Sequence, residues 1–397
     1  MNTSTIHKQL IARFIQINRK VIGVIACGVM LFGGSCISEY TPKDIDNVRD
    51  LLVVEGMITN DTTHILLSKS VGITESFKKD NYIYNATIAV ESSDGERFEG
   101  YHASEGSYVI PNGKLDVDKS YRLSIKYNSE QYESSFLTPL ITPEIDSIGV
   151  MKAGKGEEVF ITVTTHDAGN QTAFYKWSYK ETWEFKAEMY ANARLTQHLD
   201  TIFHSLRTSE NTYYCWNSEH SKSILLGNTT KLQENVVSNH KLLSMPPSSE
   251  KLSIMYHIHV TQNQIRKETY DYISNMQKNG EDMGGLFAPI PSEMQGNVIC
   301  VSNPDIRTIG YVDVSVESTK SYYVPQDMGY YEAPRFYCSS REPIPVVSPE
   351  LILQMGYAIL DFNTLTGDIE QITVRSCVDC TLSGTKKKPK DWPTNHL

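Results

Sequence analysis

The sequence predicts a mainly β protein with two sandwich modules, the second carrying an inserted α-helix and a C-terminal segment stapled by cysteines. Short runs of alternating apolar and polar residues recur along the chain, and turn residues separate them at regular intervals. Tyrosine is abundant, with 23 copies in 397 residues. Tyrosine, threonine and valine favour the pleated, half-buried surface of a strand. Short strands at regular spacing therefore indicate sandwiches of the immunoglobulin or fibronectin kind.

The first sandwich is expected over residues 51–142. Its clearest strand is 120–127, where Tyr121, Leu123 and Ile125 alternate with polar residues, as in a strand with one buried face. Two Thr-Pro steps mark the end of the module. Five further strands are expected at 51–58, 64–68, 85–91, 106–110 and 131–137.

The second β-rich domain is expected over residues 143–397. Residues 173–185 form a long aromatic run that fits either a sandwich core or an exposed platform for a flat ligand. The clearest helix lies near 263–279, where Ile265, Tyr272 and Met276 recur at helical spacing. Other strands are expected at 159–165, 224–226, 251–261, 296–303 and 308–317.

The amino terminus has the three zones of a secretory signal that ends at a lipidation cysteine. Residues 1–20 are basic and lack acidic side chains, residues 21–32 are apolar, and three small residues precede Cys36. The apolar run is shorter than the ~20 residues that a membrane-spanning helix needs. We expect 1–35 to be a lipoprotein signal peptide, Cys36 to carry lipid, and 36–50 to be a flexible tether.

Two alternatives stay open for this region. Cys27 also follows a short apolar run, but that run is only about six residues long, below the usual ~7–15. The other alternative is an uncleaved first segment that anchors the chain. Elsewhere in the sequence no segment is apolar and long enough to cross a membrane.

The charge balance argues against nucleic acid and anionic lipid as partners. The whole chain has a formal charge of −10, and removing residues 1–35, which carry four basic and no acidic residues, lowers it to −14. A nucleic-acid-binding protein would instead show a basic face.

Five cysteines remain once the two in the amino-terminal region are set aside: Cys215, Cys300, Cys338, Cys377 and Cys380. An exported protein meets an oxidising compartment, so we expect disulfides among them and one unpaired thiol. Cys377 and Cys380 form a CxxC motif, which also occurs in redox pairs and zinc sites. A redox pair normally sits at a helix start and zinc needs a second ligand pair. The sequence suggests neither, which favours structural disulfides.

Histidines and catalytic motifs give little support for an enzyme. His257 and His259 alternate on one predicted strand, a spacing that suits two metal ligands. No third ligand is recognisable, so packed or surface histidines are the simpler interpretation. The chain has no HExxH, P-loop, dinucleotide-binding or Gly-x-Ser-x-Gly motif. We expect a protein that is not an enzyme and that uses no metal or cofactor.

Four tyrosines are the best candidates for ligand recognition. Tyr322, Tyr323, Tyr330 and Tyr331 lie near a proline and a glycine, which predicts an exposed loop. Aromatic rings on such a loop can stack on a flat ligand.

Four stretches of the sequence carry a family resemblance. They are Leu52-Val53-Val54-Glu55-Gly56; Tyr214-Cys215-Trp216; Gln295 to Cys300 with Asn303-Pro304 and Ile309-Gly310-Tyr311; and Cys377-Val378-Asp379-Cys380-Thr381 with Gly384, Lys388-Pro389 and Trp392. Together they resemble the domain of unknown function 4249 (DUF4249) family of Bacteroidota outer-membrane lipoproteins, over nearly the whole mature chain. The chain departs from the pattern in placing Lys390 before Asp391-Trp392. The resemblance supplies no catalytic residue.

The resemblance implies a protein held by lipid at the outer membrane, on its periplasmic or cell-surface face, and often encoded beside TonB-dependent transporters. We therefore expect a non-enzymatic accessory or ligand-binding partner of a TonB-dependent β-barrel transporter, with a small molecule or glycan as candidate ligand. Two rivals stay open. One is a surface adhesin or structural module, and the other is an envelope enzyme or redox protein that uses Cys377 and Cys380.

Overall fold

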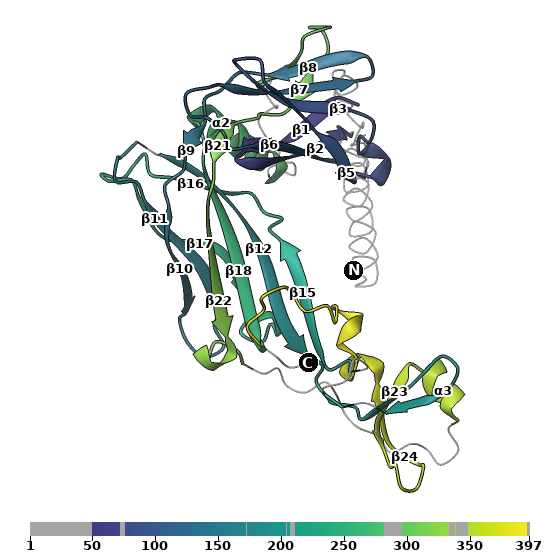
Figure 1. The fold of residues 1–397 in the computed structure, drawn as a ribbon. Helices are drawn as coiled ribbons and strands as arrows, with labels where there is room; N and C mark the ends of the chain where they lie inside the picture. The colour runs from purple at the N-terminus through teal and green to yellow at the C-terminus, as the bar shows by residue number, and fades with distance from the viewer. Residues whose placement is uncertain are drawn as a thin grey trace, which may run out of the picture. The chain divides into compact units, whose positions relative to one another are not determined.

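The computed structural model describes residues 50–71, 76–171, 173–203, 205–206, 211–281, 296–332, 338 and 348–394. The predicted signal peptide, Cys36 and all of the predicted tether except its last residue lie outside this set. The described chain is mainly β, as predicted, and its strands enclose two large hydrophobic cores (Figure 1). None of its helices within the described residues has the length and apolar character needed to span a membrane.

The first sandwich places two sheets around one core. One sheet has the order β5-β6-β2-β1-β21-β9, with β20 also paired to β1, and the other has the order β19-β8-β7-β3-β4. The 3-10 turn η2 (Lys79–Asn81) lies between β2 and β3. The strands are β1 (Leu52–Thr59), β2 (Asp61–Lys69), β3 (Thr87–Ser92), β4 (Arg97–Glu99), β5 (Tyr101–Ser104), β6 (Ser107–Gly113), β7 (Tyr121–Tyr127), β8 (Glu130–Ser134), β9 (Leu140–Ile141), β19 (Val298–Cys300), β20 (Thr308–Ile309) and β21 (Val314–Val316).

The alternating pattern of the sequence matches the strands of this sandwich. All six predicted strands are present, as β1, β2, β3, β6, β7 and β8. On β7 the side chains of Tyr121, Leu123 and Ile125 are buried in the core. Three strands come from a part of the chain that the sequence assigned to the second domain, because β19, β20 and β21 pair with β8, β1 and β9.

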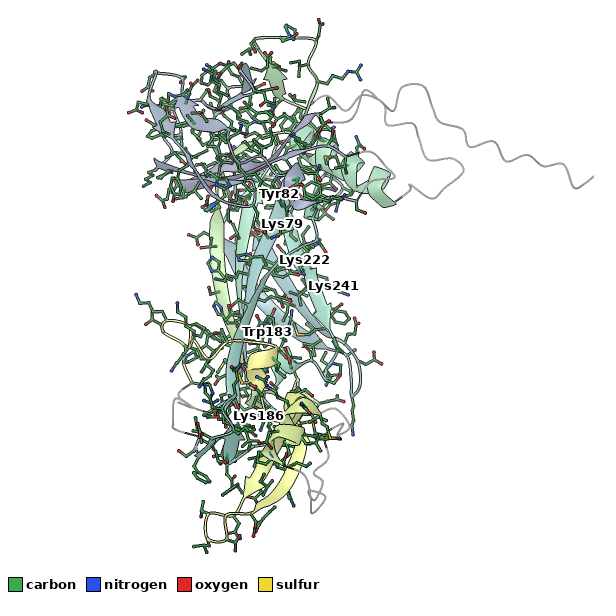
Figure 2. The ribbon with its side chains drawn as sticks, turned by 90° about the vertical axis from the view of Figure 1, so that its right-hand side faces the viewer. Lys79, Tyr82, Trp183, Lys186, Lys222 and Lys241 are labelled. Carbon is green, nitrogen blue, oxygen red and sulfur yellow. A yellow bond between two sulfur atoms is a disulfide. The ribbon has the colours of Figure 1, made fainter. Side chains whose placement is uncertain are left out.

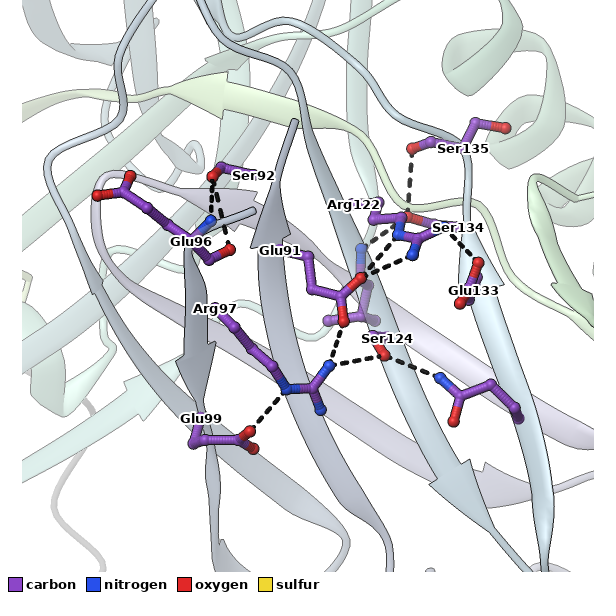
Figure 3. A network of polar contacts seen from close by, with 12 residues as sticks. Glu91, Ser92, Glu96, Arg97, Glu99, Arg122, Ser124, Glu133, Ser134 and Ser135 are labelled. Atoms are coloured by element: carbon purple, nitrogen blue, oxygen red, sulfur yellow. Dashed lines mark hydrogen bonds and ion pairs between the residues drawn. The ribbon is translucent and has the colours of Figure 1, made fainter. Parts of the chain in front are cut away.

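A charge network covers the outer face of the sheet that contains β3, β4, β7 and β8 (Figure 3). Glu91 stands directly opposite Arg122 on β7 and Arg97 on β4, and it accepts hydrogen bonds from both guanidinium groups. Burial acts to raise the pKa of Glu91, but the hydrogen bonds and charges of the two arginines outweigh it and lower the pKa. Opposite charges on adjacent strands stabilise the sheet.

The second sandwich packs a three-stranded sheet, β10-β11-β17, against a five-stranded sheet, β15-β12-β18-β22, in which β16 also pairs with β12. The turn η3 (Glu250–Leu252) lies between β17 and β18, and the turn η4 (Gln326–Met328) follows β22. Its core includes Tyr175, Trp177, Trp183 and Phe185 of the aromatic run, which confirms the core interpretation. The strands are β10 (Ile145–Lys152), β11 (Val159–His166), β12 (Phe174–Lys186), β15 (Tyr214–His220), β16 (Leu225–Asn228), β17 (Val236–Met245), β18 (Met255–Gln264) and β22 (Ser318–Pro325).

The predicted helix is present as α2 (Lys267–Glu281) but begins four residues later than expected. Strand β18 continues to Gln264, because the backbone there still pairs with β12 opposite Tyr175. Helical periodicity in the sequence therefore starts before the helix itself.

A small C-terminal unit was not anticipated. It contains two hairpins and a short helix around a minor core of Ala191, Leu360 and Val378. Polar residues interrupt its short strands, which removes the alternation that marks the larger sheets. The elements are β13 (Ala193–Leu195), β14 (Thr201–Phe203), α3 (Pro349–Gln354), β23 (Tyr357–Phe362), β24 (Ile369–Val374), η5 (Arg375–Cys377) and η6 (Cys380–Leu382).

A buried carboxylate joins the first sandwich to the start of α2. Asp313 is 0 % exposed and precedes β21. It accepts hydrogen bonds from the backbone N–H and the guanidinium of Arg266, from the Thr269 hydroxyl at 2.6 Å and from the Val314 N–H at 2.8 Å. Arg266 also donates to the carbonyl of Thr138, at the end of the first module. A buried charge of this kind is tolerated because all its neighbours are donors.

We expect Asp313→Ala to lower the free energy of unfolding by about 3–5 kcal/mol, because Arg266 would keep its charge without a partner. Urea unfolding followed by circular dichroism measures this loss. Asp271→Ala is a matched control, since it removes the exposed pair with Lys267 on the same helix and should cost at most about 0.5 kcal/mol. Equal losses in the two variants would contradict the role of Asp313.

The lowered pKa of Glu91 predicts a pH dependence of stability. Its ion pairs contribute stability above the unfolded-state pKa of about 4.3, and this contribution is lost as pH falls through the lower folded-state pKa. Glu91→Gln should therefore flatten the decline of the unfolding midpoint between about pH 5 and 3. Glu99→Gln removes an exposed carboxylate from the same Arg97 and serves as control. An unchanged pH slope in Glu91→Gln would refute the assignment.

Candidate functional site

The five-stranded sheet has an outer face, which points away from the core of the second sandwich and carries polar and aromatic side chains. Alternation along β12 directs Trp183 and Phe185 inward and Thr182 and Glu184 outward. Trp183 is labelled in Figure 2. His257 of β18 stands opposite Thr182, which places this histidine on the same outer face.

A C-terminal segment crosses this face. We call residues 384–394 the strap. It begins beside β15, where Trp216 and Thr385 exchange two backbone hydrogen bonds of 2.8 Å. It then reaches β12, β18 and β22, because the ring of Trp392 contacts Glu184, His257 and Tyr323. The strap thus covers one end of the sheet.

The strap is fastened by a buried carboxylate. Glu184 is 0 % exposed, and its Oε2 accepts a hydrogen bond of 2.9 Å from Nε1 of Trp392. The hydroxyl of Thr394 donates to the same oxygen. Trp392 is itself buried, so its indole N–H needs a partner there. Trp392 therefore closes the C-terminal segment against the sheet.

The start of the strap requires a glycine. A Cβ atom on Gly384 would lie 2.7 Å from the carbonyl oxygen of Trp216 and 2.8 Å from the ring of Phe185. Both neighbours are fixed, the first by strand pairing and the second by the core. This close approach explains why Gly384 stands beside the cysteines in the C-terminal motif.

Two disulfides hold the segment that precedes the strap. Cys215 of β15 is bonded to Cys380, and Cys338 is bonded to Cys377. Cys300 is buried and unpaired. The two sulfurs of the CxxC motif are therefore not bonded to each other, and each links the C-terminal segment to a distant part of the chain.

An imidazole–aromatic cluster borders the strap. The ring of His257 lies 4.3 Å from that of Tyr323, and both rings contact Trp392 edge-on. Nδ1 of His259 lies 2.9 Å from the hydroxyl of Ser321. Burial, with the nearby charge of Lys180, lowers the pKa of both histidines, so both are neutral at pH 7.

The four candidate tyrosines do not form one exposed loop. Tyr322 and Tyr323 lie on strand β22, because its pairing with β18 runs to Pro325. Tyr322, Tyr330 and Tyr331 pack against the core, and the Tyr330 hydroxyl donates to the carbonyl of Val150. Tyr323 is 39 % exposed and is the member that the structure brings to the site.

The described side chains at this face of the sheet are a mixture of polar and aromatic groups. They bring together neutral imidazoles, hydroxyls and an exposed aromatic ring. No group of three or more His, Cys, Asp or Glu side chains in the described part of the chain is arranged to hold a metal ion. Sequence reasoning missed Glu184, whose only signal is a carboxylate between two aromatic residues of a buried strand.

Two open depressions lie elsewhere in the described structure. One, of about 370 Å³, is lined by residues that include Pro143, Asp146, His166 and Asp167. Nδ1 of His166 lies 2.8 Å from the Asp146 carboxylate, which raises the pKa of the histidine. The other, of about 380 Å³, adjoins the ion pair between Lys152 and Glu332. Neither contains a residue that the sequence predicted as a site.

We expect the double variant Cys215→Ser/Cys380→Ser to release the strap. The bond spans 165 residues, so its loss should lower the free energy of unfolding by about 2–5 kcal/mol. Trypsin should then cut faster after Lys387 and Lys390, which limited proteolysis with mass spectrometry would show. Cys300→Ala is the control, since it removes a thiol without cutting a cross-link. Unchanged cleavage of the strap in the double variant would count against the fastening role.

Comparison with known sequences places the chain in a family. No curated protein matches the chain. The sequence model described as "Domain of unknown function (DUF4249)" matches residues 37–321, which is well over half of the chain. The matched range contains three of the four motifs that carried the resemblance and ends before the fourth, which begins at Cys377. The protein therefore belongs to the DUF4249 family.

Proposed function

We propose that the protein is a non-enzymatic lipoprotein of the outer membrane of Bacteroidota that serves as an accessory or ligand-binding partner of a TonB-dependent transporter. It is cleaved before Cys36 and held by lipid on that cysteine, at the periplasmic or cell-surface face. The arrangement of a basic stretch, a short apolar run and three small residues before Cys36 is the observation that carries this proposal. Several acyl chains hold a protein firmly where one is marginal.

The geometry of the strap supports binding over catalysis. Three motif residues hold backbone segments together. The backbone of Trp216 pairs with Thr385, Gly384 allows the chain to approach Trp216 closely, and the indole of Trp392 binds Glu184. They are held by packing and hydrogen bonds and are not presented to a substrate. A fixed surface of this kind loses little conformational entropy when a partner binds.

The redox alternative finds less support. Cys377 and Cys380 are each 3 % exposed, and each is bonded to a cysteine outside the motif. Thiol exchange needs an accessible sulfur, and a redox CxxC pair forms its bond within the motif. A surface adhesin uses the same β architecture, and a deletion strain separates it from a transport partner: the adhesin predicts normal growth with poor attachment.

Purification from membranes in mild detergent tests the proposal. The native protein should appear in the membrane fraction with lipid on Cys36, and it should recover a β-barrel transporter identifiable by mass spectrometry. Cys36→Ser should abolish lipidation and release the protein from the membrane fraction, whereas the control Cys27→Ser should change neither. Recovery of no transporter under several growth conditions would contradict the proposed transporter partner. Lipid on a residue other than Cys36 would contradict the proposed anchor.

A further inference from the structure

The strap carries a run of lysines at its centre. Lys386, Lys387, Lys388 and Lys390 fall within five residues, and Asp391 is the one acidic residue of the strap. Lys387 and Lys390 are exposed and Lys388 is half-buried. In the described part of the chain, no ion pair or side-chain hydrogen bond joins Lys387, Lys388 or Lys390 to a carboxylate.

Several other lysines of this acidic protein are paired with carboxylates. Lys119 binds Asp94 and Glu96, and Lys251 binds Glu181 and Glu219. The strap differs because Lys387, Lys388 and Lys390 lie within four residues of the described chain without such a partner. Like charges in a short segment repel one another, so their grouping costs stability unless another molecule compensates.

The strap is held in place on both sides of the lysines. Thr385 is paired with Trp216 before the run, and Trp392 is hydrogen-bonded to Glu184 after it. The N–H of Lys387 also donates to the hydroxyl of Thr385 at 3.1 Å. These contacts fix the backbone that carries the charges, so the run is a built surface and not a free tail.

A fifth lysine lies on the face of the sheet that the strap crosses. Lys186 lies two residues after Glu184 on β12 and therefore points to the same outer face. It is exposed, and its Nζ lies 5.9 Å from the centre of the Tyr213 ring (Figure 2).

We propose that Lys387, Lys388 and Lys390 of the strap, with Lys186, form a docking surface for an acidic segment of a partner protein. Carboxylates of that segment would pair with the ammonium groups. A flat anionic membrane fits less well, because it would face much more of a protein whose charge without the signal is −14. A short peptide segment meets the strap alone, since charges more than ~8 Å away are screened at physiological salt. The inference rests on the proposed function only for the identity of the partner.

Binding of fluorescein-labelled decaglutamate to the mature protein tests the surface by fluorescence anisotropy. The triple variant Lys387→Glu/Lys388→Glu/Lys390→Glu should weaken binding about tenfold or more, because three attractive charge pairs are lost and three repulsive ones replace them. Binding by the native protein should also weaken as salt rises from 50 to 300 mM. Circular dichroism checks that the variant is folded, and Lys387→Gln/Lys388→Gln/Lys390→Gln is a milder second variant.

A matched control separates the strap from total charge. Lys114, Lys126 and Lys231 are exposed lysines far apart in the sequence, and replacing all three by Glu changes the net charge by the same amount. This control should weaken binding less than about threefold. Equal weakening in both triple variants, or no binding by the native protein, would overturn the proposal.

Two further experiments identify the kind of partner. Vesicles of phosphatidylcholine with phosphatidylglycerol should not bind, and binding to them in place of the peptide would overturn the protein-segment assignment. In the membrane purification, the strap variant should keep its lipid but lose its partner. If the native protein recovers no transporter, the proposed function fails. The peptide assay still shows whether the strap binds an acidic segment.

Discussion

The carboxylate of Asp313 is the interaction on which the arrangement of the described chain most depends. The chain passes between the two sandwiches after β9, again through α2, and again from β21 to β22. Arg266, which directly precedes α2, links the first and the last of these crossings. It donates hydrogen bonds to the carbonyl of Thr138, just before β9, and to the carboxylate of Asp313, just before β21. A buried ion pair seldom adds much net stability over apolar packing, but an unpaired member is strongly unfavourable. Such a pair therefore selects one arrangement of the three passages over others.

The same logic operates at the other end of the second sheet. Glu184 interrupts a buried aromatic stretch of β12, and the indole of Trp392 with the hydroxyl of Thr394 satisfies it. The bond between Cys215 and Cys380 brings the C-terminal segment close enough for these contacts to form. A covalent link across a long loop reduces the freedom of the unfolded chain, and the hydrogen bonds then fix the final position. The strap is thus a product of one cross-link and one buried carboxylate.

Local patterns in the sequence predicted the strands and core residues whose conformation depends on residues nearby in the chain. The alternation of Tyr121, Leu123 and Ile125 identified β7, and the aromatic run identified a core strand. What the sequence could not reveal depends on distant residues. Asp313 and Glu184 look like ordinary polar residues, four bonded cysteines alone allow three pairings, and β19 to β21 return to a sandwich that precedes them by over 150 residues. Tyr322 was expected on a loop because Pro325 suggested a turn, yet pairing with β18 continues to that proline.

The net charge of the whole chain and the local charge of the strap favour different partners. A formal charge of −14 after residue 35 weighs against long or flat anionic partners, because such partners meet the average field of the protein. A short segment meets only the charges within about one Debye length, ~8 Å at physiological salt. Lys387, Lys388 and Lys390 place three positive charges within four residues, next to the single negative charge of Asp391. The acidic remainder then repels a misplaced acidic segment, so an overall negative charge sharpens the choice of docking position on the strap.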